Sequence, residues 1–176
     1  MVRCDSSQSG VLEWTQSQSV FRSAASYTPV ATPLQGNGWK RAVKIEGVGH
    51  ITSVVRDLGR MAGFLCDGLG AEEVYDSASE NFSPSREKFF VLGGVWIAAM
   101  EGAPLKERSY RHLALQGSDN DLPKFEARLR ALDVEIKPPR PRVEGEGRSL
   151  YFYDFDNHLF ELHTGTLEQR LQRYSQ

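Results

Sequence analysis

Hydrophobic and polar positions follow two different periods along the chain after residue 44. Segment 45–55 alternates with a period of two, which predicts a strand with His50 and Thr52 on one face. The segment that begins at Asp57 has a helical period instead, and aspartate is a favoured residue at a helix N-terminus. Its apolar stripe consists of Leu58, Met61, Phe64 and Leu65. The pattern therefore predicts a strand followed by a helix.

The same order of elements is predicted twice. Strands are expected at 72–75, 87–92 and 95–100, the last two joined by a Gly-Gly pair that is typical of a hairpin turn. The second round consists of a strand at 110–116, a helix at about 119–132, and strands at 134–136, 148–153 and 159–163. In each round a strand histidine precedes an aspartate by seven residues, as His50/Asp57 and His112/Asp119. We expect an α+β fold of two paired βαβββ modules, about 45–104 and 108–165, because one module cannot bury a sheet face alone.

The first 43 residues differ in composition from the rest. They are dense in Ser, Gln, Thr, Gly and Pro, and their apolar residues follow no period. We expect residues 1–43 to be a disordered or poorly ordered extension of a single domain at 44–172, and we assign it no function.

Charge and composition limit the classes of partner. A formal net charge of -2 gives no electrostatic reason to bind nucleic acid or an anionic membrane. No apolar run approaches the roughly 20 residues that cross a bilayer. The two cysteines, Cys4 and Cys66, are too few for a disulfide framework, so we expect reduced thiols and a cytoplasmic protein.

Three residues suggest a metal site. His50 and His112 occupy matching places on the first strands of the two modules, and Glu161 lies on the last strand of the second. Two imidazoles and one carboxylate leave open positions on a divalent cation such as Mn, Fe(II), Ni or Zn. His163 shares a face with Glu161 by alternation and is an alternative ligand, whereas His158 lies in a turn and is interpreted as structural.

Several segments resemble the fosfomycin-resistance proteins of the vicinal-oxygen-chelate superfamily. The similar segments are 47–52 (GVGHIT), 107–114 (ERSYRHLA) and 158–165 (HLFELHTG). Two further segments, 82–90 (FSPSREKFF) and 140–154 (RPRVEGEGRSLYFYD), are similar to the hydrolase branch of that family. The resemblance extends over residues 45 to 172.

The resemblance implies an enzyme that opens the epoxide of fosfomycin with water. It implies a homodimer in which His50 of one chain joins His112 and Glu161 of the other around Mn(II), with Fe, Ni, Zn or Mg as alternatives. It also implies that Glu87 is the general base. The place in the first module that corresponds to Glu161 falls near Ala98, so no second, symmetric metal site is expected.

The phosphonate of the substrate needs cations and hydroxyl donors. The residues that the resemblance assigns to it are Thr52, Tyr110, Ser149, Tyr151, Arg170 and Arg142, with Tyr110 reaching in from the partner chain. Three alternatives stay open at this point: a thiol transferase that uses glutathione, bacillithiol or cysteine, an Fe(II) dioxygenase with His163 as its acid–base group, and a metal-free protein that sequesters a drug.

Overall fold

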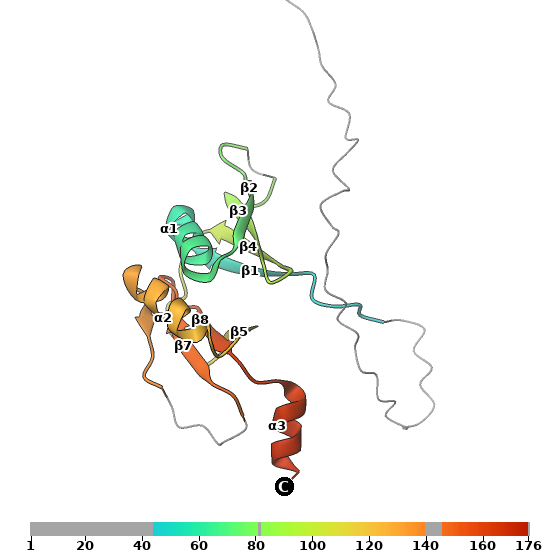
Figure 1. The fold of residues 1–176 in the computed structure, drawn as a ribbon. Helices are drawn as coiled ribbons and strands as arrows, with labels where there is room; N and C mark the ends of the chain where they lie inside the picture. Colours follow the sequence, from blue (N-terminus) through green and yellow to red (C-terminus); the bar gives the residue numbers. More distant parts are fainter. Residues whose placement is uncertain (1–43, 81, 140–145, 176) are drawn as a thin grey trace, which may run out of the picture. The chain divides into compact units, whose positions relative to one another are not determined.

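Each half of the chain forms a four-stranded sheet in the computed structural model, which describes residues 44–80, 82–139 and 146–175 (Figure 1). The first sheet has the order β1-β4-β3-β2 and contains β1 (His50–Val55), β2 (Glu72–Asp76), β3 (Glu87–Leu92) and β4 (Val95–Glu101). The second has the order β5-β8-β7-β6 and contains β5 (His112–Gln116), β6 (Glu135–Ile136), β7 (Ser149–Tyr153) and β8 (Leu159–His163). In both sheets the first and last strands pair in parallel and the other pairs are antiparallel. The predicted pair of βαβββ modules is confirmed.

The helices follow the first strand of each module, with one more at the C-terminus. They are α1 (Leu58–Gly63), which continues into the π-helix η1 (Phe64–Gly68), α2 (Leu122–Ala131) and α3 (Leu167–Tyr174). Asp57 caps α1 as predicted, because its carboxylate accepts the backbone N–H of Arg60 at 2.9 Å. The change to π-helical hydrogen bonding at Phe64 was not predicted. A stripe of apolar residues shows which side is buried and does not distinguish the two kinds of helical turn.

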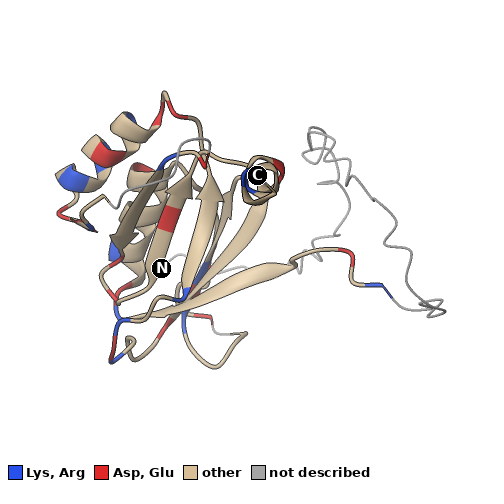
Figure 2. Cartoon of the chain, turned by 90° about the horizontal axis from the view of Figure 1, so that it is seen from below, with Lys and Arg blue, Asp and Glu red and all other residues tan. Residues whose placement is uncertain are grey.

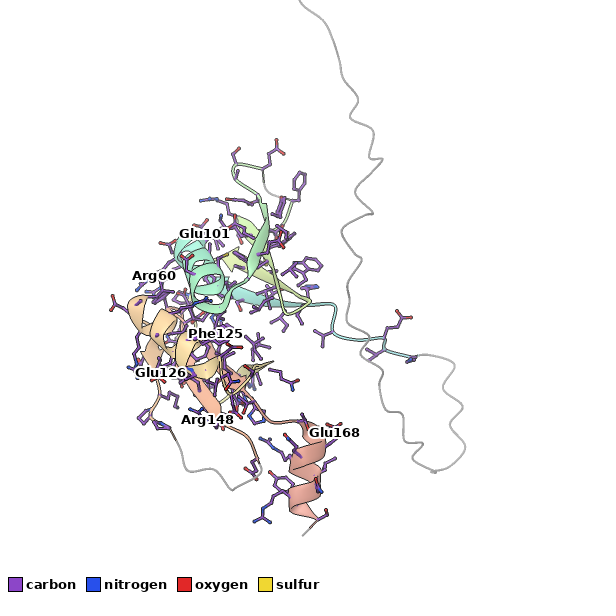
Figure 3. The ribbon with its side chains drawn as sticks, viewed as in Figure 1. Arg60, Glu101, Phe125, Glu126, Arg148 and Glu168 are labelled. Atoms are coloured by element: carbon purple, nitrogen blue, oxygen red, sulfur yellow. The ribbon has the colours of Figure 1, made fainter. Side chains whose placement is uncertain are left out.

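The two modules share one hydrophobic core. The side chain of Phe64, from the first module, is 1% exposed, and its ring lies 5.1 Å from that of Phe160 in the second, centroid to centroid. Arg56, at the end of β1, donates to the buried carboxylate of Asp156 at 2.8 Å. Phe125, on α2, packs against this core, and the guanidinium of Arg60, on α1, lies 3.6 Å from the centre of the Phe155 ring in the second module (Figure 3). Burying each large apolar side chain contributes roughly 1.5–3 kcal/mol, so the core holds the modules together.

The face of the first sheet that points away from this core is unusually apolar. Along β1, His50, Thr52 and Val54 are exposed, whereas Ser53 and Val55 are buried. Val54, Val91 and Trp96 remain 41%, 40% and 39% exposed on that outer face. Lys, Arg, Asp and Glu lie mostly on helices and loops (Figure 2), and three acidic residues of the first sheet lie on its edge strand β2. An apolar sheet face of this kind is typical of an interaction surface.

Several element boundaries differ from those predicted. The first strand begins at His50 instead of residue 45, and α2 begins at Leu122 instead of residue 119. Helix α3 was not predicted, although Thr166 and Gln169 form a complete capping box that the sequence carries. The predicted extension at 1–43 lies outside the described residues. Every helix in the described part of the chain is too short or too polar to cross a membrane.

Candidate metal centre

The register of the second sheet gathers polar side chains on the face opposite the core. Ala114 and Tyr151 flank Glu161 from the two neighbouring strands, and Ser149 is the partner of His163. Because side chains alternate between faces, His112, Tyr151, Ser149 and His163 project on the same side as Glu161. The other side carries Phe152 and Phe160 into the core. A strand pattern that buries one face therefore also assembles the candidate site on the other.

His112 and Glu161 form the centre of this group. The imidazole Nε2 lies 3.0 Å from the Glu161 Oε2. The Nδ1 atom lies 2.8 Å from the backbone carbonyl of Tyr110, and a carbonyl oxygen only accepts, so Nδ1 carries the proton of that bond. In a neutral ring Nε2 then presents its lone pair to a carboxylate oxygen. Two electron-rich atoms held this close fit a shared cation. A backbone carbonyl that accepts the other N–H of the imidazole and so orients the ring is typical of metal sites.

The surroundings of Glu161 keep its carboxylate ionised. Its side chain is buried, and burial by itself raises the pKa of a carboxyl group. Hydrogen bonds from the hydroxyls of Ser149 and Tyr151, with the favourable electrostatic interaction of the nearby His112 and His163 rings, outweigh burial, so the pKa of Glu161 lies below its usual value. The Ser149 Oγ donates to Oε1 at 2.5 Å. An ionised carboxylate is the form that binds a divalent cation.

His50 lies apart from this pair within one chain. It begins β1 in the first sheet, where its ring contacts that of Trp96 at 4.4 Å between centroids. Among the described residues, no three His, Cys, Asp or Glu side chains gather closely enough to hold a metal ion. One chain thus brings together two of the three predicted ligands, His112 and Glu161, and leaves the third on the outer face of the other sheet.

The first module has no carboxylate at the place that Glu161 occupies in the second. Thr52 pairs with Ala98 between β1 and β4, as Ala114 pairs with Glu161 between β5 and β8. The register therefore puts Ala98 in the position equivalent to Glu161. A metal centre of the same composition in the first module has no carboxylate ligand available at this position.

Glu87 is buried although charged residues flank it in the sequence. Its side chain is 6% exposed, and one carboxylate oxygen accepts the Ser83 hydroxyl at 2.8 Å. The neighbouring cations turn elsewhere: Arg86 donates to the carbonyl of Ala78, and Lys88 pairs with two acidic side chains on β2. Glu87 pairs with Met100 and through it with Val54, which places it on the same outer face as His50. A solvated surface charge does not have this environment.

The predicted substrate contacts are distributed over both modules. Thr52 and His112 line one cavity of about 470 Å³, to which His158 also contributes. Tyr110 stacks edgewise on His112 of its own chain, with its hydroxyl 3.5 Å from that of Tyr151. Arg170 lies on α3, and within the described residues its guanidinium has no hydrogen bond to the polar group of the second module. Arg142 lies outside the described residues.

Asp154 and Ser83 form hydrogen bonds with His158 and Glu87, and neither contact could be predicted from the sequence. Asp154, buried in the turn before β8, accepts from the Nδ1 of His158 at 2.7 Å and fixes that ring, in keeping with its structural interpretation. Ser83, the partner of Glu87, lies in a loop whose path the alternation of residues does not specify.

Comparison with known proteins connects this geometry to a family. Residues 47–162 match the model of the Glyoxalase/Bleomycin resistance protein/Dioxygenase superfamily. The chain is 55% identical over 130 residues to the fosfomycin resistance protein FosX of Listeria monocytogenes, an alignment that covers 74% of this chain and 98% of the relative. It is 37% identical over 136 residues to the metallothiol transferase FosB of Staphylococcus haemolyticus, covering 75% of this chain and 93% of the relative.

A solved structure is similar over the same extent. A variant of FosX from Listeria monocytogenes, complexed with Mn(II) and 1S,2S-dihydroxypropylphosphonic acid, superimposes with a TM-score of 0.68 at 54% sequence identity. The alignment covers 74% of this chain and 99% of that one.

Proposed function

Because the chain belongs to the Glyoxalase/Bleomycin resistance protein/Dioxygenase superfamily, and within it to the FosX fosfomycin resistance proteins, we infer that it confers resistance to fosfomycin by inactivating the drug. We propose that the reaction is the addition of water to the epoxide, which yields a diol. The family resemblance drawn from the sequence is confirmed.

The ligand of the related structure supports water as the nucleophile. Dihydroxypropylphosphonic acid carries two hydroxyls on neighbouring carbons, which is the product that water gives when it opens an epoxypropylphosphonate. A thiol would leave a thioether on one of these carbons. The lower identity to the metallothiol transferases points in the same direction.

We propose that His50 of one protomer joins His112 and Glu161 of its partner at a Mn(II) centre. The observation that carries this proposal is the pair of lone-pair-bearing atoms, the His112 Nε2 and the Glu161 Oε2, held 3.0 Å apart. This pair lacks a third ligand within the described part of one chain. The exposed apolar face around His50 supports a second protomer as the source of that ligand. When bound, Mn(II) supplies a Lewis acid for the oxygen of the substrate.

Glu87 is proposed as the general base. Its carboxylate is shielded from bulk solvent by burial and accepts the hydroxyl of Ser83, which leaves lone pairs that can accept a proton. The proton leaves the attacking water for Glu87 as the oxygen of that water bonds to the epoxide carbon. The carbon–oxygen bond of the ring breaks, and the released oxygen takes up a proton to complete the diol.

Hydroxyl and guanidinium groups are proposed to bind the phosphonate. Ser149, Tyr151 and Tyr110 present three hydroxyls on the face that carries Glu161. Thr52 adds a fourth from the first module, beside His50. Arg170 and Arg142 are the proposed cations, since a phosphonate is bound by charge-assisted hydrogen bonds. We also propose a cytoplasmic location, which the free thiol of Cys66 supports.

Phosphorus NMR of fosfomycin, incubated with the full chain and Mn(II), tests the reaction. We expect conversion to the diol without any thiol, at a rate that glutathione, bacillithiol or cysteine does not change. Conversion that requires a thiol would move the protein to the transferase class. No conversion under any of these conditions would exclude fosfomycin as the substrate.

A further inference from the structure

Ser149 connects the carboxylate of Glu161 to a second histidine. Its Oγ lies 2.5 Å from the Glu161 Oε1 and 2.9 Å from the His163 Nδ1. The three residues are neighbours because β7 and β8 pair in a register that sets Ser149 opposite His163 and Tyr151 opposite Glu161. The His163 ring itself stays 3.7 Å from the carboxylate, so its closest path to Glu161 runs through the hydroxyl.

The single proton of the hydroxyl decides the direction of these bonds. A carboxylate offers no proton, so the 2.5 Å bond is one in which Ser149 donates to Glu161. The proton between Ser149 and His163 must then come from the imidazole. His163 thus donates its Nδ1–H to the Ser149 oxygen, and this polarises the hydroxyl toward Glu161.

The backbone around His163 fits its ring closely. A Cβ at Gly165 would come within 2.8 Å of the His163 Nε2 and 2.6 Å of the Glu146 carbonyl. A Cβ at Gly147, which has φ +74°, would meet the backbone of Gly165 at 2.5 Å. The carbonyl of His163 also accepts the N–H of Gly117 at 2.9 Å. These contacts hold the imidazole on Ser149 and leave no room for a side chain at either glycine.

We propose that His163 is a positioning residue for the metal centre: by donating its Nδ1–H to Ser149, it orients the Glu161 carboxylate toward the cation. This inference rests on the proposed metal site and gives His163 a role other than that of a ligand. The contact between Ser149 and the phosphonate then requires the hydroxyl proton to turn away from Glu161, so the two roles of Ser149 exclude each other at any instant.

Two substitutions of His163 separate this role from a general structural one. In His163→Asn the amide nitrogen takes about the place of Nδ1, whereas in His163→Gln it takes about the place of Nε2. We expect His163→Asn to bind Mn(II) nearly as tightly as the wild type and His163→Gln to bind it about 10–100-fold more weakly. Electron paramagnetic resonance of free Mn(II) measures the dissociation constant with the metal alone, and circular dichroism checks that each variant is folded.

The possible results separate the role of His163 from the existence of the metal site. Failure of the wild-type chain to bind Mn(II) would remove the metal site itself. Wild-type affinity in both variants, or an equal loss in both, would overturn the role of His163 and leave the metal site in place. If His163→Gln does not fold, Ser149→Ala serves instead: it should also weaken Mn(II) binding, and unchanged binding would overturn the inference.

Discussion

The two modules have the same topology and very different outer faces. When the registers of the two sheets are matched, four positions on the outer faces correspond: Ala98 to Glu161, Glu87 to Ser149, Phe89 to Tyr151 and Met100 to His163. The second module therefore carries a connected group of polar side chains where the first is largely apolar. The first keeps two polar groups of functional interest, His50 and the buried Glu87.

We propose that the two modules supply different parts of one site. His50 and His112 occupy the same place in the two sheets, yet within the described residues only His112 has a carboxylate beside it. The first module presents a second histidine, the buried carboxylate of Glu87 and an apolar face, whereas the second module presents the pair of His112 and Glu161. The proposed metal site therefore requires the outer face of the first module in one protomer to meet the outer face of the second module in its partner.

The largest effect is expected from Glu161→Gln, which removes the carboxylate from the second module. The variant should lose Mn(II) affinity by more than about 100-fold. This exceeds the loss of about 10–100-fold that is expected when a residue that only orients a ligand is replaced. Titration with Mn(II) measures this loss. Glu135→Gln, an exposed position in the same sheet, is the matched control and should retain wild-type affinity. Equal affinity in Glu161→Gln and the wild type would exclude Glu161 as a ligand.

A smaller and separable effect is expected in the first module. Glu87→Gln should keep the fold and the Mn(II) affinity but lower the rate of hydration by at least about 100-fold, because the attacking water loses its base. The rate is followed by phosphorus NMR beside Glu72→Gln, an exposed control on the same sheet. Turnover near the wild-type rate would remove Glu87 from the mechanism.

No effect is expected from deleting residues 1–43. A chain that begins at Lys44 retains both sheets, the shared core and every candidate site residue, so its rate should match that of the full chain. Expression yield and the rate of fosfomycin loss are the measurements. A large drop in soluble or active protein would show that the first 43 residues belong to the folded domain.

The sequence predicted the elements better than their contacts. Alternation with a period of two placed β3 and β8 at their observed bounds, and the stripe that includes Leu58 and Met61 identified the buried side of α1. The same alternation placed Glu161 and His163 on one face. It did not reveal that a serine lies between them, because that contact depends on the pairing of β7 with β8. Local periodicity carries no information on the register between strands.

Pattern alone was also least informative where burial contradicts residue type. Glu87 lies between Arg86 and Lys88, a setting that favours a solvated strand charge. In the structure Arg86 and Lys88 have partners of their own, while Glu87 is buried and accepts the hydroxyl of Ser83. Helix α3 was missed although the sequence carries its capping box and has Leu167, Leu171 and Tyr174 at helical spacing; all three side chains are exposed within the described chain.

Mixing two inactive chains tests whether each metal site takes its ligands from two protomers. His50→Ala and Glu161→Ala should each abolish fosfomycin hydration alone. In a mixed dimer one site lacks both groups, while the other combines an intact His50 with an intact Glu161. Co-refolding equal amounts should therefore restore about a quarter of wild-type activity. No recovery, with mixed dimers shown to form by native mass spectrometry, would contradict the shared site.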